Sequence, residues 1–461
     1  MGFEIMAPLM FLGLVGFLLL GYPVAFSLAA NGLLFMFIGI NQGFFEFSLM
    51  QALPDRVFGI MSNSVLLAIP FFTFMGLVLE RSGMAEELLD TLGQLFGPVR
   101  GGLAYSVIFV GALLAATTGV VAASVIAMGL ISLPIMLRYG YDTRLASGVI
   151  AASGTLAQII PPSLVLIVLA DQLGTSVGDM YKGAMLPSLV LAALYVGYVF
   201  VVTMVKPEAA PALPLAARTL HGMALLRKAM VSLVPPLVLI FLVLGTIFLG
   251  IATPTEGGAM GAAGALILAV AKRRLTVDLL KQAMDSTAKL TSFVVFILIG
   301  STVFSLVFRG VDGDLWVEGL LTALPGGEVG FLIVVNILVF LLAFFLDFFE
   351  IAFIIVPLLA PVAQKLGIDL VWFGILLGIN MQTSFMHPPF GFALFYLRSV
   401  APKEVKTSQI YWGAIPFVIV QIVMVAIVLA FPGLVLEDKA VNSDAPVEIQ
   451  LEGLDGGYNT Q

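Results

Sequence analysis

The chain has 461 residues, of which 60% are hydrophobic and only 11% are charged. Soluble domains carry about 25% charged residues, so this composition excludes an ordinary soluble protein and indicates one solvated mainly by lipid. The net charge of −7 says little about partners, no nucleic acid is expected among them, and the absence of cysteine excludes disulfides and thiolate metal sites.

Long continuous apolar runs favour helices over the short alternating segments of a membrane β-barrel. At 1.5 Å per residue, a helix that crosses the bilayer needs roughly 20 apolar residues, and the chain has room for about ten or more crossings. We therefore predict an all-α, multi-pass membrane protein. In chain order, helices are predicted near residues 5–21, 23–40, 64–81, 184–204, 230–250, 256–271, 288–308 and 410–431.

The remaining segments have mixed or polar composition. Residues 44–60 and 84–97 combine charged and apolar side chains and are predicted to lie at the membrane interface. Residues 206–229 are predicted to form a polar linker, and the acidic tail from Glu437 is predicted to be disordered.

Two tracts, 103–173 and 330–399, are interrupted by glycine and proline. Residues 103–138 contain two short apolar arms around a polar tip at 116–119, which favours a re-entrant helical hairpin whose tip is surrounded by protein or water. Residues 144–173 are predicted to form one span broken between Gly154 and Ser163, because Pro161 and Pro162 remove backbone donors and disfavour helix before them.

A second Pro-Pro pair, Pro388-Pro389, lies 227 positions after the first, and the same offset aligns several other glycine, proline and aspartate residues. The pattern predicts an internal duplication with a broken helix in each copy, which is a sequence sign of a transporter binding site. Five predicted crossings separate the helix near 64 from its copy near 288, and this odd number makes the second copy inverted. The predicted organisation is an N-terminal scaffold (1–63), a first repeat (64–205), a linker with scaffold helices (206–277), a second, inverted repeat (278–432) and a polar tail (433–461).

Positively charged residues predict the orientation. The linker 206–229 and the loop 272–281 fall on one side of the membrane, with Arg138 and Arg144. The positive-inside rule makes this side cytoplasmic, which places both termini in the periplasm.

Polar side chains gather beside the two breaks. Unwound backbone and hydroxyl groups supply oxygen ligands for a hard cation such as Na⁺, and helix N-termini facing a gap suit an anionic substrate group. Serine and threonine also pack helices together in membranes, so a purely structural role is the alternative for each of them. The residues concerned are Thr117, Thr118, Ser124, Ser153, Gly154, Thr155, Gln158 and Ser163 in the first copy, and Asp347, Glu350, Asn380, Gln382, Thr383, Ser384 and His387 in the second.

Asp347, His387 and Thr253 each have a specific interpretation. Asp347 is costly in an apolar run and is therefore a functional candidate. His387 directly precedes the second Pro-Pro pair and has three open roles, as a structural hydrogen-bonding residue, a proton-linked group or a substrate contact. Thr253 is predicted to cap a helix whose first turn contains Glu256.

Six short motifs are distributed over the chain, namely Gly21–Ser27, Gly140-Tyr141-Asp142, Ile160-Pro161-Pro162-Ser163, Thr253–Gly257, Leu346-Asp347 and Pro388-Pro389-Phe390-Gly391. Together they resemble the large membrane subunit of tripartite ATP-independent periplasmic (TRAP) transporters, the DctM-like family, and the resemblance covers nearly the whole chain. It departs at two places: His387 stands where threonine is common, and the tip of the first hairpin has Thr-Thr-Gly where relatives have a Gly-Ser-Ser-like run.

The resemblance implies an elevator-type secondary transporter of the bacterial inner membrane, driven by Na⁺. It implies two partners, a small four-helix membrane subunit and a periplasmic substrate-binding protein, and a small organic acid or polyol as substrate. It also implies one Na⁺ site formed by Thr117, Thr118 and Gly119 with the break from Gly154 to Pro162, which includes Pro161. It implies a second site formed by Asp347 with the break from Thr383 to Pro389, which includes Pro388. Substrate contacts between the two sites are expected from Ser124, Gln158, Ser163, Gln382, Ser384 and His387.

Other classes of function remain as alternatives. A self-sufficient Na⁺/dicarboxylate carrier of the related inverted-repeat superfamily would need no partner proteins. A channel would not need a doubled broken helix. An enzyme is poorly supported, since the chain has no cysteine, only His221 and His387 as histidines, and no nucleotide-binding or zinc motif.

Overall fold

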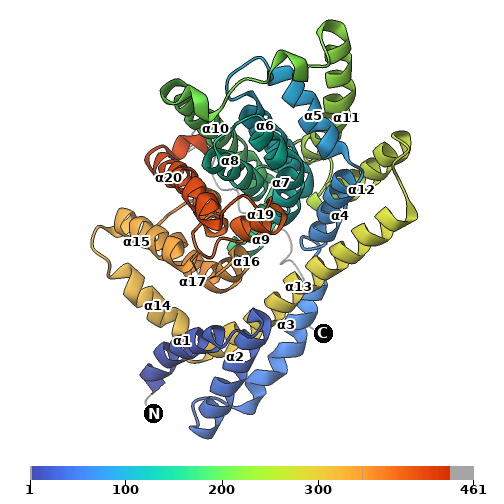
Figure 1. The fold of residues 1–461 in the computed structure, drawn as a ribbon. Helices are drawn as coiled ribbons and strands as arrows, with labels where there is room; N and C mark the ends of the chain where they lie inside the picture. The colour runs from blue at the N-terminus through green and yellow to red at the C-terminus, as the bar shows by residue number, and fades with distance from the viewer. Residues whose placement is uncertain (1–2, 345, 437–461) are drawn as a thin grey trace, which may run out of the picture.

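The computed structural model describes residues 3–344 and 346–436, and the regular structure of these residues is helical, with no strand among them (Figure 1). Eight of the described helices are long and apolar enough to cross a membrane, and α14 and α15 form a further pair bent by 115°. The predicted multi-pass helical class is confirmed. The full crossings are fewer than the ten for which the chain has room, because several apolar segments are short helices that meet at a break.

The helices run through the chain in the following order. The α-helices are α1 Phe3–Leu19, α2 Val24–Asn41, α3 Ala52–Met61, α4 Ala68–Arg81, α5 Met84–Phe96, α6 Gly102–Thr118, α7 Val121–Arg138, α8 Thr143–Thr155, α9 Leu164–Leu173, α10 Val177–Val205, α11 Gly222–Phe248, α12 Pro254–Ala271, α13 Val277–Gly310, α14 Gly313–Thr322, α15 Gly327–Leu342, α16 Phe348–Glu350, α17 Val356–Lys365, α18 Leu370–Met381, α19 Phe392–Val400 and α20 Thr407–Ala430. Short 3₁₀ segments are Phe47–Gln51, Pro207–Ala209, Leu215–Ala217, Pro432–Leu434 and, at the two breaks, Leu156–Gln158 and Gln382–Phe385, and a π-helical turn covers Ile351–Ile355.

Several helices extend beyond the predicted apolar runs. The predicted linker is shorter than expected, because α11 already begins at Gly222. Likewise α13 begins at Val277 inside the predicted loop, as a polar extension in which Asp285 and Lys289 pair at 2.7 Å one turn apart. Such i,i+4 pairs support a helix without apolar burial, so hydropathy alone could not locate these ends.

Helices α5 and α3 differ although both were predicted to be interfacial. Helix α3 has no buried residue, whereas α5 buries one face against α6 and α11. Two ion pairs also tie α5 to its neighbours, Glu87 to Lys272 at the end of α12 at 2.8 Å and Asp90 to Lys228 of α11 at 2.5 Å. Helix α5 is therefore held by protein contacts and not by the membrane interface alone.

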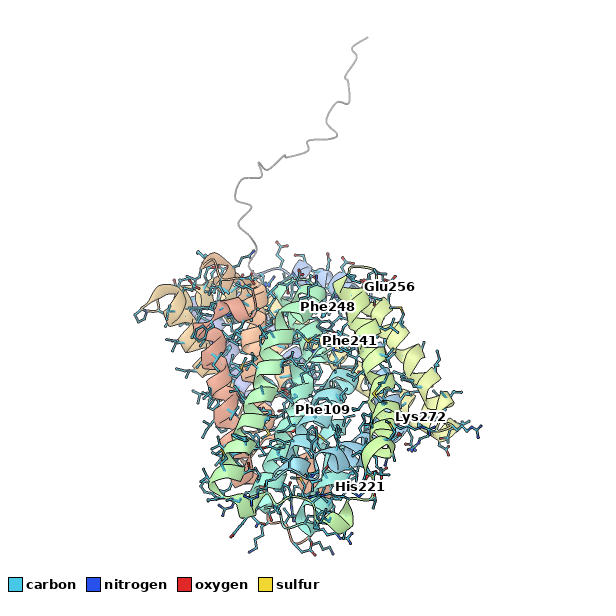
Figure 2. The ribbon with its side chains drawn as sticks, turned by 90° about the horizontal axis from the view of Figure 1, so that it is seen from above. Phe109, His221, Phe241, Phe248, Glu256 and Lys272 are labelled. Atoms are coloured by element: carbon cyan, nitrogen blue, oxygen red, sulfur yellow. The ribbon has the colours of Figure 1, made fainter. Side chains whose placement is uncertain are left out.

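The segments that precede α11 and follow α12 lie at one end of the molecule, and the loop that joins α11 to α12 lies at the other end. Figure 2 shows His221 and Lys272 towards one end and Phe248 and Glu256 at the other. At that other end Thr253 and Glu256 form the predicted reciprocal cap of α12, and Thr255 donates a hydrogen bond to the Ser64 carbonyl at 2.6 Å. The linker and the basic loop thus share a side, as the charge pattern predicts.

Local structure repeats at the offset of 227 residues. Gly140 and Gly367 have φ values of 82° and 77° and end a helix in each copy. Two residues later Asp142 and Asp369 each cap the next helix by accepting hydrogen bonds from two backbone N–H groups. The turn α7–α8 and the turn α17–α18 are therefore built in the same way.

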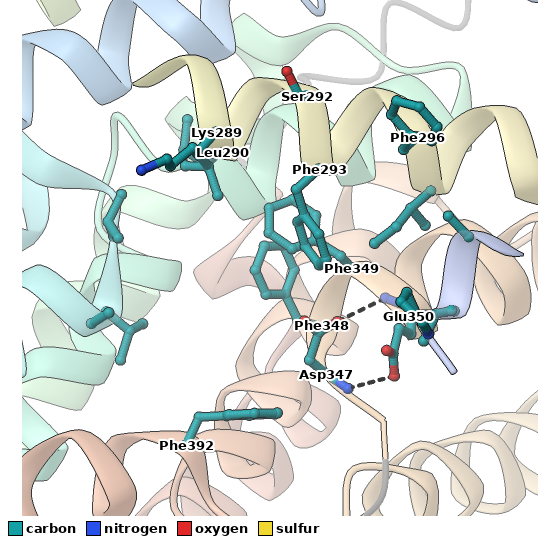
Figure 3. A pocket seen from close by; sticks show the side chains of 18 of the residues that line it. Lys289, Leu290, Ser292, Phe293, Phe296, Asp347, Phe348, Phe349, Glu350 and Phe392 are labelled. Atoms are coloured by element: carbon teal, nitrogen blue, oxygen red, sulfur yellow. Dashed lines mark hydrogen bonds between the residues drawn. The ribbon is translucent and has the colours of Figure 1, made fainter. Parts of the chain in front are cut away.

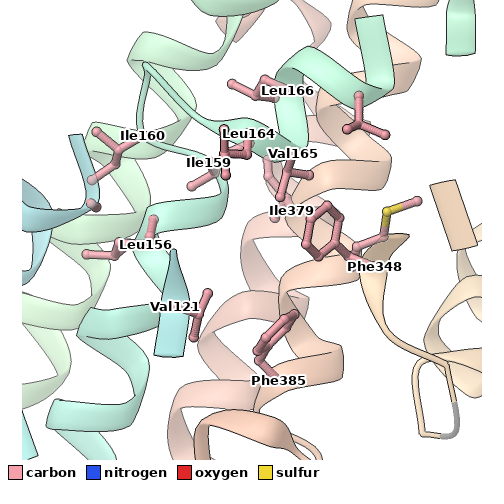
Figure 4. Close-up of a cluster of buried hydrophobic side chains, with 14 of the residues drawn as sticks. Val121, Leu156, Ile159, Ile160, Leu164, Val165, Leu166, Phe348, Ile379 and Phe385 are labelled. Atoms are coloured by element: carbon pink, nitrogen blue, oxygen red, sulfur yellow. The ribbon is translucent and has the colours of Figure 1, made fainter. Parts of the chain in front are cut away.

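Both copies contain a helical hairpin followed by a broken helix. Helices α6 and α7 form the first hairpin, and α8 and α9 are the two halves of the first broken helix. Helices α15 and α17, with α16 and the π-helical turn between them, form the second hairpin, and α18 and α19 are the halves of the second broken helix. The tips and the breaks meet in a buried apolar cluster that includes Val121, Leu164, Phe348 and Phe385 (Figure 4).

Candidate functional site

A cavity of about 1010 Å³ lies where the two hairpin tips approach the two breaks (Figure 3). Its walls are the tip of the first hairpin, the first break, the tip of the second hairpin, the start of α19, the N-terminal turn of α2 with the residues before it, and residues 288–297 of α13. A second cavity of about 330 Å³ follows farther along α13, at residues 298–309, and contains Arg56, Asp171 and Arg309.

The first wall is the contact between the first hairpin tip and the first break. Gly119 has φ 57° and ends α6, and a Cβ atom on it would lie 3.2 Å from Leu164 Cγ and 3.7 Å from the Pro162 carbonyl oxygen. Helix α7 starts immediately afterwards, and its Val121 and Ala122 line the cavity. The first N–H groups of a helix have no intrahelical acceptor, so this helix end offers donors and a positive dipole end to the cavity.

Gln158 adds an amide to this wall. Its side chain is 1% exposed, and neither its Nε2 nor its Oε1 has a hydrogen-bond partner within the described part of the chain. Its carbonyl accepts a hydrogen bond from Ser163, whose hydroxyl also caps α9. A buried amide without partners costs about 1–3 kcal/mol, which a bound ligand or water can offset.

Asp347 and Glu350 form the acidic corner of the cavity. Asp347 Oδ1 accepts a hydrogen bond from the Glu350 N–H, and Glu350 Oε2 accepts one from the Asp347 N–H, both at 3.0 Å. Asp347 is thus not an acid inside a helix, as the apolar run suggested, but a helix cap at the hairpin tip. Both carboxylates of this reciprocal cap belong to residues that line the cavity.

His387 lies behind the second hairpin. Its ring is 4.2 Å from the Phe344 ring and 4.4 Å from the Phe340 ring, measured between centroids, and it is 2% exposed. Neither ring nitrogen makes a hydrogen bond of normal geometry with a described residue. His387 does not line the cavity.

The other residues of the second break are distributed around its interior. Gln382 Nε2 donates to the Thr155 carbonyl of the first break at 2.8 Å, and these two residues are 227 positions apart, so equivalent points of the two copies touch. Thr383 donates to the Asn380 carbonyl at 2.6 Å. Gln382 Oε1 and Ser384 Oγ are buried and lack a hydrogen-bond partner among the described residues.

Only some of the predicted site residues reach the cavity. Gly119, Gln158 and Asp347 line it, whereas the buried Ser124, Gly154, Pro161, Ser163, Gln382, Thr383 and Ser384 and the half-buried Pro388 do not. The side chains of Thr117 and Thr118 lie outside the described residues. The site roles of all these residues stay predictions.

The oxygen-rich, cysteine-free composition of the breaks fits an alkali cation better than a transition metal. The described residues contain no group of three or more histidine, cysteine, aspartate or glutamate side chains that could hold a metal ion. Hydroxyl, amide and carboxylate oxygens at Ser384, Gln382 and Asp347 are ligands of the kind that Na⁺ accepts.

The cavity also contains residues that sequence reasoning missed, above all phenylalanines. Phe348 and Phe349 follow Asp347 at the hairpin tip, and Phe392 follows the second break. The sequence marked these phenylalanines as possible cavity residues only through their closeness to the predicted site residues. In a chain with 36 phenylalanines, hydropathy does not distinguish a ring facing a cavity from one facing lipid.

Comparison with known proteins identifies the family. Residues 11–434 match the family model described as "Tripartite ATP-independent periplasmic transporter, DctM component". The chain belongs to the DctM family. The resemblance predicted from the sequence motifs is confirmed.

Two relatives illustrate the range of the family. The chain is 30% identical to the C4-dicarboxylate TRAP transporter large permease protein DctM of Pseudomonas aeruginosa, over 84% of this chain and 89% of that one. It is 28% identical to the sialic acid TRAP transporter large permease protein SiaM of Vibrio cholerae, over 91% and 95% of the two chains. These relatives are permease components and not enzymes, which confirms the prediction that the chain has no enzymatic activity.

The fold is also similar to that of a solved transporter. The YdaH transporter of Alcanivorax borkumensis aligns with a TM-score of 0.59 and 16% identity, covering 84% of this chain and 88% of that one. At this identity the likeness concerns the fold alone.

Proposed function

We propose that this DctM-family protein is the permease subunit through which a Na⁺ gradient drives uptake of a small organic carboxylate delivered by a periplasmic binding protein. The observation that carries the proposal is the single cavity enclosed by both hairpin tips and both breaks, with helix N–H donors on one wall and Asp347 on the other. Anion and cation ligands therefore face the same space.

The first wall supports binding of the carboxylate. The N-terminus of α7 and the unpaired Gln158 amide both bring donors to the cavity. A carboxylate bound there would pair with the Gln158 amide, which lacks a partner among the described residues, and a negative charge is favourable at a helix N-terminus.

The acidic corner and the second break support Na⁺ coupling. Asp347 presents a carboxylate at the cavity wall while it caps the helix at the hairpin tip. The buried acceptors Gln382 Oε1 and Ser384 Oγ belong to the same repeat. Binding of Na⁺ near Asp347 would neutralise the corner and favour entry of an anion, which couples the two ligands electrostatically.

The arrangement of the repeats supports transport by an elevator motion of an inverted pair. The two hairpins and broken helices would move as one body against α2 and α13, and the two cavities at residues 288–297 and 298–309 of α13 would mark the two ends of the path. The contact of equivalent positions, Gln382 with Thr155, is expected for copies related by a pseudo-two-fold axis.

Partners and location follow from the family. A small membrane subunit would pack against apolar side chains on the outside of the permease, and the binding protein would dock from the periplasm. We place the assembly in the bacterial inner membrane. A self-sufficient carrier remains the second candidate because its fold would be the same.

Reconstitution tests the proposal. The chain is purified with its small subunit, incorporated into proteoliposomes and assayed for uptake of labelled carboxylates, with and without the binding protein and with Na⁺ or choline outside. We expect uptake only with both Na⁺ and the binding protein. Uptake without the binding protein would favour the self-sufficient carrier, and Na⁺-independent uptake would contradict the coupling.

A further inference from the structure

We infer that the substrate of this permease is a carboxylate with one acidic group on an aromatic body, in place of a dicarboxylate or a polyhydroxylated acid. The inference rests on the proposed function and adds the chemical class of the substrate. It is carried by the rings and charges that line the cavity.

The lining is unusually aromatic. Nine of the 26 residues that line the cavity are phenylalanine or tyrosine, whereas aromatic residues make up 11% of the chain. This enrichment is about threefold, so the general hydrophobicity of a membrane protein does not account for it.

Five of these rings form a continuous series, the phenylalanine row. From α13 to α19 it consists of Phe293, Phe349, Phe348, Phe385 and Phe392, with consecutive ring centroids 5.8, 3.9, 6.2 and 5.9 Å apart. The row crosses from α13 over the second hairpin tip to the start of the second half of the broken helix. Figure 3 labels four of its members, Phe293, Phe349, Phe348 and Phe392, and Figure 4 labels Phe385. Phe293 and Phe392 at its two ends are 45% and 40% exposed and offer faces or edges to a ligand.

An aromatic ligand matches such a surface. Rings at 4.5–7 Å in offset or edge-to-face arrangements gain about 0.5–1.5 kcal/mol each beyond their buried area. A hydroxyl-rich ligand would instead lose hydrogen bonds to water against the row without replacement, which costs about 1–3 kcal/mol per group.

The charged residues favour a single carboxylate. Among the described residues that line the cavity, Lys289 is the only cationic one; its side chain is 76% exposed and pairs with Asp285. Asp347 and Glu350 both line the cavity. One carboxylate can bind at the α7 N-terminus and Gln158. Even with Na⁺ bound near Asp347, a second carboxylate would meet Glu350 without a further cationic side chain to balance it, and like charges in a partly buried site repel strongly.

The permease and its small subunit, purified in detergent with Na⁺, provide a direct test independent of the binding protein. Benzoate, succinate and gluconate serve as probes, and thermal stabilisation of the complex measures binding. We expect benzoate to stabilise the complex at concentrations at which succinate and gluconate have no effect.

Substitutions then locate the binding surface. Phe392→Ala and Phe293→Ala shorten the row at its exposed ends, and each is expected to raise the benzoate concentration for half-maximal stabilisation by about tenfold, through loss of a ring contact. Phe395→Ala is the matched control, because Phe395 lies on the same helix as Phe392 and is 47% exposed but does not line the cavity. It should leave benzoate binding unchanged.

The outcomes separate the inference from the proposed function. Na⁺-dependent uptake of succinate or gluconate by the reconstituted assembly, with no effect of benzoate, would overturn the inference and leave the proposed function intact. An equal loss of benzoate binding in Phe395→Ala and Phe392→Ala would also overturn it. Absence of Na⁺-driven uptake for every carboxylate tried would contradict the proposed function and the inference with it.

Discussion

At the scale of single residues, Asp347 combines a structural and a proposed ionic role. Its side chain caps the helix at the second hairpin tip, and Glu350 caps in return. Such caps contribute about 1 kcal/mol and are kept by asparagine, which still offers a side-chain oxygen to the N–H groups. The two roles can therefore be separated by substitution.

The first prediction concerns Asp347→Asn and Asp347→Ala. Asparagine should preserve the thermal stability but raise the Na⁺ concentration for half-maximal uptake by about tenfold or more, since a contact to a charged group is lost. Alanine should lose about 1 kcal/mol of stability in addition. Unchanged Na⁺ dependence in Asp347→Asn would remove Asp347 from the cation site.

His387 is enclosed by aromatic rings, and this enclosure favours the structural one among its three predicted roles. Between Phe340 and Phe344 the ring makes packing contacts, and its nitrogens lack hydrogen bonds of normal geometry with described residues. A buried polar group without partners is costly, so replacement by an apolar ring of similar shape should be nearly neutral or stabilising. We therefore interpret His387 as a packing residue.

The second prediction follows from this interpretation. His387→Phe should retain uptake and leave its pH profile unchanged, while His387→Ala should cost about 3 kcal/mol of stability through a cavity. Uptake measured between pH 5.5 and 8.5, together with thermal unfolding, checks both statements. A shifted pH profile in His387→Phe would restore the proton-linked role.

Sequence reasoning at this scale found residues with unusual polarity and missed residues with ordinary hydrophobicity. Asp347 and Gln158 are exceptional in apolar sequence, and both line the cavity. The phenylalanine row consists of the commonest aromatic residue in the chain. Whether such a ring lines the cavity depends on the direction in which it points, and the sequence does not show this direction.

At the scale of elements, the hairpins and breaks were accessible from sequence because their causes are local. Short apolar arms around a polar tip predicted the hairpin α6–α7, and paired prolines predicted the break between α8 and α9. The contact between a tip and a break was not accessible, because it depends on the packing of segments that are far apart in the chain.

Gly119 tests that contact. It has φ 57° with the Leu164 side chain 3.2 Å from its missing Cβ, while Gly174 has φ 65° and no heavy atom within 4 Å. An alanine costs roughly 1–2 kcal/mol at either position because of the left-handed conformation.

We expect Gly119→Ala and Gly174→Ala to lose similar stability, with Gly119→Ala also losing most of its uptake because the hairpin tip is pushed from the first break. Thermal unfolding and proteoliposome uptake, measured in parallel, check this prediction. Equal uptake in the two variants would show that the tip contact is not needed for transport.

At the scale of the whole molecule, the proposed elevator motion requires the second hairpin to slide past α13. Phe349 of the hairpin and Phe293 of α13 have ring centroids 5.8 Å apart, and Phe26 of α2 and Phe296 of α13 have centroids 6.0 Å apart. The chain has no cysteine, so introduced pairs have no background.

The fourth prediction uses these two pairs. A short thiol cross-linker between Phe293→Cys and Phe349→Cys should abolish the uptake that this double variant retains, and cleavage of the linker should restore it to the level before cross-linking. The same linker between Phe26→Cys and Phe296→Cys joins two segments outside the hairpins and should leave uptake at the level of that variant before cross-linking. Full uptake by the cross-linked hairpin pair would contradict the elevator motion.

The repeat itself was visible in sequence, since matched glycines and prolines impose the same turns in both copies. The meeting of the copies at Thr155 and Gln382 was not, because an offset in sequence carries no information on distance in space.

Coupling of uptake to the Na⁺ gradient is the central claim, and one measurement tests it most directly. Proteoliposomes with the permease, its small subunit and the binding protein are given the same total Na⁺ either as an inward gradient or equally on both sides. Accumulation of the carboxylate above its outside concentration only under the gradient is the predicted result. Equilibration to the same level in both conditions would contradict Na⁺-driven transport.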